Sequence, residues 1–329
     1  MEAGELLKRY AAGERDFRGA ILIGANLERA NLEGANLSGA YLLTANLSRA
    51  FLRGVNLTGA SLYRANLSFA KVSEARLSEA DLTKANLQGA YLVKSLLVGA
   101  KLSGANLSGV NLRLANLLGV NLCGADLRWI NLRSANLVNA NLSWANLSGA
   151  KLSGALLRGA LLHGVKLNGA FMNGVDLNGV NLDGVNLSEA KLSGANLIGA
   201  NLAAANLSSA QLRVAFLSRS NLHAANLTGA SLIKADLCEA NLSKADLSEA
   251  DLSNADLTGA QLNLASLRDA DLSEASLRGA YLWRANLNVA EMRGADLSGA
   301  SLCGAYIETA KWQEANLTGA TMPDGTLHE

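Results

Sequence analysis

Histidine and cysteine are the residue types in this chain best suited to acid–base, redox or metal chemistry. They comprise His163, His223, His328, Cys123, Cys238 and Cys303. A catalytic or metal site needs several such groups within hydrogen-bond reach of one another. No Cys-x-x-Cys pair occurs, so the spacing excludes a zinc ribbon and a thioredoxin-like redox site. Whether the remaining groups meet depends on the elements that carry them.

Aspartates recur in a way that resembles a carboxylate cluster, as at Asp246, Asp251 and Asp256. Their spacing is five residues, however, and the same spacing governs the Asn-Leu-Ser triplets and most glycines. Glycines locked five apart form neither a Gly-x-Gly-x-x-Gly loop nor a phosphate-binding P-loop. These residues therefore indicate a repeat, and the sequence predicts a protein that is not an enzyme and has no metal or cofactor.

The repeat has a period of five residues. From Arg15 to Gly319 the chain divides into 61 quintets without insertion or deletion, and position one of each quintet falls on a multiple of five. Position one is Ala in 50 quintets, position three is Leu in 55, position two is commonly Asn or Asp, and position five holds 29 of the 32 glycines. We expect positions one and three to face inward and position two to face outward. Gly at position five would supply the positive φ of a type II turn.

Inward, outward and inward residues alternate within a quintet as in a three-residue strand. Each quintet then forms one short side and one corner of a coil, and successive coils stack at about 4.8 Å through strand-like hydrogen bonds. The interior is expected to be a column in which Leu stacks on Leu and Ala on Ala. Half of the residues are hydrophobic but only 5% are aromatic, which suits an interior tiled from two small side chains.

Quintets such as Ala35–Gly39, Ala105–Gly109 and Ala225–Gly229 have the sequence Ala-Asn-Leu-Ser/Thr-Gly, which resembles the pentapeptide repeat proteins. The resemblance implies an all-β solenoid, a right-handed quadrilateral β-helix with four quintets per coil, and hence about fifteen coils. We expect a helical cap over residues 1–14, an uninterrupted repeat over residues 15–320, and a capping turn and tail over residues 321–329. Both ends resemble those of cyanobacterial members of the family.

Four-sided coils would keep the candidate chemical groups apart. His163 and His223 would share a column but lie three coils, roughly 14 Å, from each other, and Cys123 and Cys303 would lie nine coils, about 43 Å, apart. A disulfide needs Cα atoms within about 7 Å. We therefore expect outward-facing histidines at the surface and free thiols, which suit a reducing cytoplasm. The opening residues lack the pattern of a signal peptide, in agreement with a cytoplasmic location.

Sorting outward residues by their place in a twenty-residue coil assigns basic residues to one side. This basic strip consists of Arg53, Lys71, Lys94, Arg113, Arg133, Lys151, Lys191, Arg213 and Lys234. Glu74 is the only acid on that side within this span, after which the side becomes acidic through Asp251, Asp271, Glu274 and Glu291. The strip is either a solvated surface that keeps the coils soluble or a docking strip for an acidic partner.

A second side carries apolar residues at positions that are otherwise polar. This apolar ridge comprises Leu96, Val98, Leu118, Val138 and Leu156. If contiguous and exposed it would form an interface, and neutral drift is the alternative. Trp129 and Trp144 stand at corners normally held by Gly. Exposed Trp beside Arg128 has the composition of a binding hot spot, although both tryptophans can equally be corner fillers.

These features favour a non-enzymatic interaction or regulatory scaffold that binds an unknown protein along the outer faces of a rigid rod. The resemblance implies a possible regulatory role, because some cyanobacterial members regulate cell differentiation. The lack of the apolar C-terminal helix found in dimeric members predicts a monomer. No membrane association is expected.

The resemblance also implies an alternative, a DNA mimic that protects or inhibits a type II topoisomerase. Such a mimic should be acidic along most of its length. Here the net charge is +1, and the acidic residues concentrate in residues 231–329. Direct nucleic-acid binding is disfavoured because aromatic residues are not regularly interleaved with the basic ones.

Overall fold

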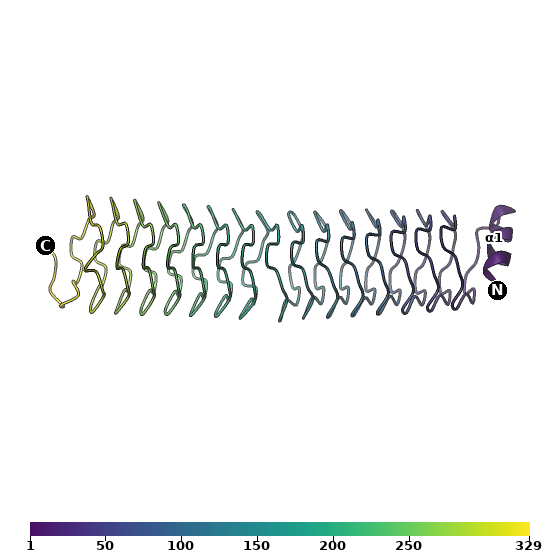
Figure 1. Cartoon of the computed structure of the whole chain (residues 1–329), viewed down its shortest axis with the longest axis horizontal. Helices are drawn as coiled ribbons and strands as arrows, with labels where there is room; N and C mark the ends of the chain where they lie inside the picture. Colours follow the sequence, from purple (N-terminus) through teal and green to yellow (C-terminus); the bar gives the residue numbers. More distant parts are fainter. The chain divides into compact units, whose positions relative to one another are not determined.

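The computed structural model describes residues Met1–Glu329 and divides them into two compact units, Met1–Lys166 and Leu167–Glu329. Each unit is a stack of coils, and the single helix, α1 (Ala3–Ala11), lies beside the first coil of the first unit (Figure 1). Parallel bridges join residues twenty positions apart in both units, from Asp16–Asn36 onward in the first and from Phe171–Lys191 onward in the second. Each coil therefore contains four quintets and has four sides.

The four sides are named here by the quintets that they contain. Side A holds the quintets that begin at residues 20, 40 and 60, and side B those that begin at 25, 45 and 65. Side C holds the quintets that begin at residues 30, 50 and 70, and side D those that begin at 35, 55 and 75. The series continues with a period of twenty through each unit.

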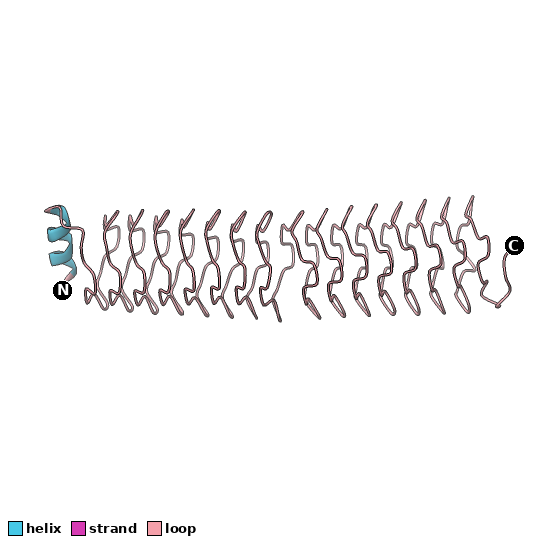
Figure 2. Cartoon of the chain, turned by 180° about the vertical axis from the view of Figure 1, so that it is seen from behind, coloured by secondary structure: helices cyan, strands magenta, loops and turns pink.

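No strand forms, and the coils in Figure 2 are loop and turn throughout. The expected three-residue strand is reduced to one bridging residue at position two of each quintet. The N–H of Asn56 donates backward to the carbonyl of Ala35 at 2.9 Å, and the N–H of Leu57 donates forward to Arg76 at 2.7 Å. The corner follows at once, so the ladder ends before a second bridge can form.

The corner is a turn closed by the N–H of the next position one, as in the 3.0 Å bond from Ala60 to the carbonyl of Leu57. Gly59 has a φ of 64°, as position i+2 of a type II turn requires. The N–H of Gly59 donates to Ser78 of the next coil at 2.9 Å. That of Thr58 donates to the side-chain oxygen of Asn56 at 3.1 Å. Every backbone donor of the quintet is therefore satisfied, which a chain that stacks its own backbone requires.

The interior of each unit is filled by positions one and three, as the period predicted. Most of these Leu and Ala side chains are completely buried, and the few β-branched or Met replacements keep the column apolar. Two buried side chains are polar, Ser95 and Ser220, and both stand at position one. The hydroxyl of Ser95 donates to the carbonyl of Val72 at 2.8 Å, whereas that of Ser220 has no hydrogen-bond partner.

Ser220→Ala is therefore expected to stabilise the protein, raising the free energy of unfolding by about 1–2 kcal/mol, because a buried hydroxyl without a partner is destabilising. Ser95→Ala removes a satisfied hydrogen bond and should leave that free energy unchanged or lower it by about 1 kcal/mol. Urea unfolding of the two variants measures both effects. Equal shifts in the same direction would contradict this account.

The predicted N-terminal helix is confirmed, with the bounds Ala3–Ala11. Leu6 is its buried residue, and the hydroxyl of Tyr10 donates to the carbonyl of Glu33 at 2.8 Å, which ties α1 to the first coils. At the other end of the chain, Thr321 forms an antiparallel bridge with Leu327. The segment boundaries and the number of coils stay predictions. No helix has both the length and the apolar character that are needed to cross a membrane.

Candidate partner-binding surface

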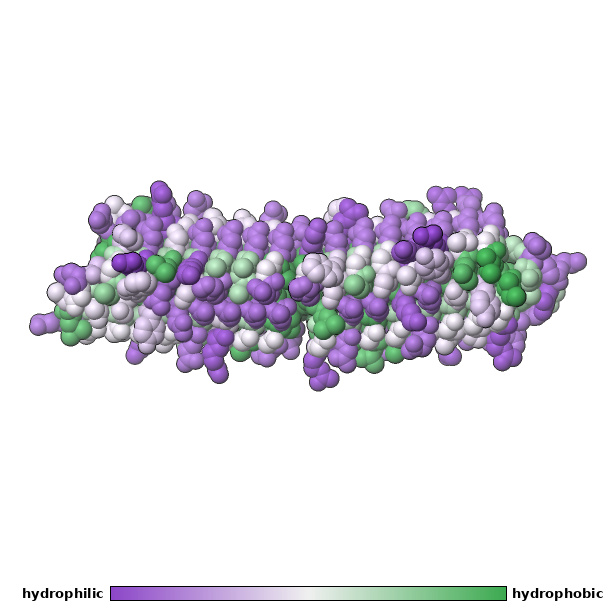
Figure 3. Space-filling model, turned by 90° about the horizontal axis from the view of Figure 1, so that it is seen from below, coloured by the Kyte–Doolittle hydropathy of each residue, from purple (hydrophilic) through white to green (hydrophobic).

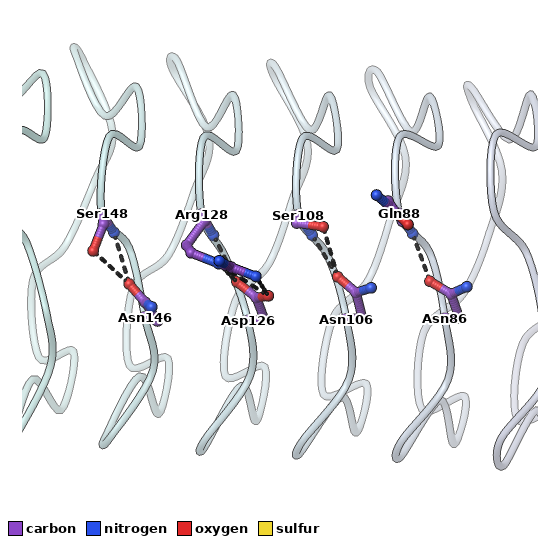
Figure 4. A network of polar contacts seen from close by, with 8 residues as sticks. All are labelled: Asn86, Gln88, Asn106, Ser108, Asp126, Arg128, Asn146 and Ser148. Carbon is purple, nitrogen blue, oxygen red and sulfur yellow. Dashed lines mark hydrogen bonds and ion pairs between the residues drawn. The ribbon is translucent and has the colours of Figure 1, made fainter.

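Asn or Asp at position two has a structural role that repeats on every side. On side B the side-chain oxygens of position two accept the backbone N–H of position four at 3.0–3.2 Å (Figure 4), in the pairs Asn86–Gln88, Asn106–Ser108, Asp126–Arg128 and Asn146–Ser148. This is the local bond that short Asn and Asp side chains form in turns.

The aspartates that resembled a carboxylate cluster make the same bond. Asp246, Asp251 and Asp256 accept the N–H groups of the residues two positions later at 3.0, 3.1 and 2.9 Å. Their five-residue spacing places them on successive sides of the coil, so each carboxylate serves its own turn. The repeat therefore accounts for their recurrence without a shared site.

Trp129 lies at a corner of side B beside an ion pair. The guanidinium of Arg128 contacts both carboxylate oxygens of Asp126, at 2.9 and 2.6 Å, and this hydrogen bonding lowers the pKa of Asp126. The Cζ atom of Arg128 lies 5.4 Å from the centre of the Trp129 ring. The indole is seated over Gly149 of the next coil, where an added Cβ would meet it at 2.6 Å. Trp129 therefore fills a corner and remains 63% exposed.

Trp144 occupies the equivalent corner of side A and is likewise largely exposed. Its ring lies over Gly164 and makes an edge-to-face contact with His163, with centroids 4.7 Å apart. The two tryptophans therefore lie on different sides and do not form one cluster. His163 is exposed apart from this contact, His223 is half-buried and His328 lies in the exposed tail.

The other candidate chemical groups are dispersed. The three cysteines are free thiols, and burial raises the pKa of Cys238. No group of three or more His, Cys, Asp or Glu side chains is arranged to hold a metal ion.

The residues of the basic strip lie on side C. In the first unit all six are exposed, and two of them have partners. The guanidinium of Arg53 pairs with Glu74 at 3.2 Å, and the ammonium of Lys71 lies 5.0 Å from the centre of the Phe51 ring. The others make no ion pair and belong to successive coils: Lys94, Arg113, Arg133 and Lys151. In the second unit, Arg213 and Lys234 are exposed and Lys191 is half-buried.

The apolar ridge lies on side D, but it is less exposed and less continuous than expected. Val98, Leu118 and Val138 follow one another in consecutive coils at position four, and the two valines are half-buried. At position two, Leu96 and Leu156 are 42% and 58% exposed. Asn116 and Asn136 occupy position two in the coils between these leucines, and the side chain of Asn136 donates a 3.1 Å hydrogen bond to that of Asn116. The ridge is therefore a short row of three side chains flanked by two separate leucines.

Sequence reasoning missed two features of the first unit. Side C has a pocket of about 450 Å³, whose lining residues are Glu33, Arg53, Lys71, Ser73 and Tyr91. Side A has an apolar cluster in its first coils, in which Ile21, Ile23 and Tyr41 are more than half exposed and Leu43 and Tyr63 are half-buried. Hydrophobic surface is visible toward the right of Figure 3, at the end of the view that carries the N-terminus. The same sorting by twenty residues could have found the cluster, because its residues occupy normally polar positions.

In each unit, buried Leu and Ala close the interior, and only the outer sides of the coils remain available to a partner. This arrangement defines a coiled repeat protein whose solvent-facing surfaces are the outer sides of its coils. The family model for pentapeptide repeats, in eight copies, matches residues 16–179 and 181–308, so the chain belongs to the pentapeptide repeat family. Members of this family with solved structures fold as right-handed β-helices.

Among solved structures, the chain is similar to HetL, a pentapeptide repeat protein involved in heterocyst differentiation regulation in the cyanobacterium Nostoc sp. strain PCC 7120, with 30% identity, full coverage of both chains and a TM-score of 0.18. A further pentapeptide repeat protein from Nostoc is 37% identical over 40% of this chain and 80% of its own, with a TM-score of 0.15. QnrB1, a plasmid-mediated fluoroquinolone resistance protein, is 18% identical over 67% of this chain and 90% of its own, with a TM-score of 0.33. No curated protein matches the chain.

Proposed function

We propose that this chain is a non-enzymatic interaction or regulatory scaffold, monomeric and cytoplasmic, which binds a partner protein along side C of its first unit. The observation that carries the proposal is the row of exposed basic side chains at Lys94, Arg113, Arg133 and Lys151, one in each of four successive coils and none in an ion pair.

The spacing of these charges favours an acidic partner. Coils stack at about 4.8 Å, and Arg113 and Arg133 stand at position four of adjacent coils, so their charges repel one another within the screening length of about 8 Å at physiological salt. An acidic surface that docks on the strip relieves this repulsion and is steered toward it. Because the backbone of each coil is hydrogen-bonded to its neighbours, the charges are displayed in a fixed order.

Reversal of three strip charges tests the proposal. The variant carrying Arg113→Glu, Arg133→Glu and Lys151→Glu should lose proteins that the wild-type full chain captures from a native lysate, as measured by quantitative mass spectrometry. A control variant carrying Arg64→Glu, Lys84→Glu and Lys101→Glu makes the same change in net charge on side A and should retain them. Thermal unfolding checks that both variants are folded.

Equal losses from the two variants, or no loss from either, would contradict a specific role for side C. A gel shift with duplex DNA at several salt concentrations addresses nucleic acid directly. If the wild-type chain and the side A control variant bind the DNA but the strip variant does not, the partner of the strip is nucleic acid and not a protein.

A further inference from the structure

The pocket on side C lies between two columns of side chains in the first unit. Lys71 and Tyr91 stand at position two of adjacent coils, whereas Glu33, Arg53 and Ser73 stand at position four. Ser73 is the smallest of the five, and its size leaves room between its larger neighbours. The volume of about 450 Å³ falls in the range of ligand pockets.

One aromatic ring lies near the ammonium group of Lys71, and a second aromatic residue follows it in the next coil. Parallel bridges join Phe51 to Lys71 and Lys71 to Tyr91, so the three side chains stand in successive coils. The Nζ atom of Lys71 lies 5.0 Å from the centre of the Phe51 ring and makes no ion pair. A long side chain held in this way loses less conformational freedom on binding. The pocket therefore contains a positioned cation without a carboxylate partner.

The other charged groups of the pocket limit which ligands can bind to the ammonium group of Lys71. The Nη2 atom of Arg53 contacts the Glu74 carboxylate at 3.2 and 3.3 Å, which leaves further N–H donors of the guanidinium available. Glu33 lines the pocket without an ion pair of its own, and its backbone carbonyl accepts the Tyr10 hydroxyl of α1. The negative charges of Glu33 and Glu74 repel any anion that approaches Lys71 and Arg53. They repel a phosphate dianion more strongly than a ligand carboxylate, which carries a single charge.

We propose that the pocket receives one Asp or Glu side chain of the partner protein, with its carboxylate on Lys71 and Arg53 and a neighbouring aromatic side chain against Tyr91. Tyr91 is 53% exposed, so its ring can stack with an incoming aromatic group. This inference rests on the proposed function, because it assigns the basic strip one specific anchoring site. The unpaired Glu33 excludes a second acidic residue from its end of the pocket.

The test uses the full chain and a fluorescein-labelled peptide with one Trp-Glu pair in a Gly/Ser background, followed by fluorescence polarisation. Lys71→Gln should weaken binding at least tenfold, because a hydrogen bond to a charged group is lost. Ser73→Phe should abolish binding by filling the pocket. Ser153→Phe is the matched control, since Ser153 occupies the same position of side C beside Lys151 but outside the pocket, and it should bind as the wild type does.

Two further arms test the chemistry of recognition. Glu33→Gln should strengthen peptide binding, because it removes a like charge, and a Trp-Gln peptide should fail to bind. A Trp-phosphoserine peptide that binds as well as Trp-Glu, no binding of the Trp-Glu peptide at all, or unchanged binding to Ser73→Phe would overturn the inference.

The outcomes separate this inference from the proposed function. If the three-charge strip variant loses its captured proteins but the peptide does not bind, the pocket inference fails and the scaffold function stands. If the peptide binds through Lys71 while the strip variant keeps every captured protein, the pocket stands and the proposed use of the strip fails.

Discussion

Leu107→Ala is expected to lower the free energy of unfolding by about 2–5 kcal/mol. The side chain of Leu107 is completely buried at position three of side B. Its backbone N–H donates to the backbone carbonyl of Asp126 at 2.7 Å, and its own carbonyl accepts the N–H of Val110 at 3.1 Å. Both bonds survive the substitution, so the loss is confined to side-chain packing. Hydrogen bonds between coils fix their separation and keep the vacated space from closing, which places the expected loss toward the upper end.

Denaturant unfolding of Leu107→Ala and Leu96→Ala measures this difference. Leu96 is 42% exposed at position two, and its replacement removes a similar side chain from the surface, so a loss of under about 1 kcal/mol is expected. Comparable losses for the two variants would show that position three is not the closed interior of the coil. Hydrogen exchange should place the loosened amides of Leu107→Ala in its own coil and the adjoining ones, because coils contact only their neighbours.

The inward positions could be predicted from the sequence because apolar residues recur at positions one and three with a period of five. A coiled chain with one side per quintet buries both of these positions. The turn at position five followed from its glycines. The sequence did not predict the backbone conformation of non-glycine residues at position five. Lys94 and Val214, for example, have positive φ values of 58° and 50°, as the glycines do. Their types disfavour that conformation, and only the constant register of the repeat imposes it.

The candidate surface was predictable where it depends on charge and order alone. The strip on side C follows from the order of the charged residues once the resemblance to pentapeptide repeat proteins implies a twenty-residue coil, which places Arg113 and Arg133 in adjacent coils. The pocket depends instead on relative side-chain size, since its lining combines the small Ser73 with larger side chains such as Arg53 and Tyr91. The packing of Trp129 over Gly149 similarly requires the corner geometry. Sequence spacing gives the column of a residue, but not the direction in which its side chain leans.

Gly89→Val is expected to lower the free energy of unfolding by about 2–4 kcal/mol, through two separable effects. Gly89 has a φ of 65°, a conformation in which a side chain is strained and a β-branched one especially so. An added Cβ would also lie 2.6 Å from the Cε1 atom of Phe69 in the preceding coil. The ring must then move away from the surface that it covers.

Gly109→Val isolates the backbone effect, because Gly109 lies on the same side in the next coil with a φ of 67° and no atom within 4 Å of an added Cβ. It should cost about 1–2 kcal/mol, and the excess cost of Gly89→Val in urea unfolding then measures the displacement of Phe69. In a Phe69→Ala background this excess should vanish, because the two changes share one contact and are not additive. An excess that persists without the ring would mean that the corner glycines are needed for their backbone alone, and that exposed aromatic residues such as Trp129 do not depend on the glycines beneath them.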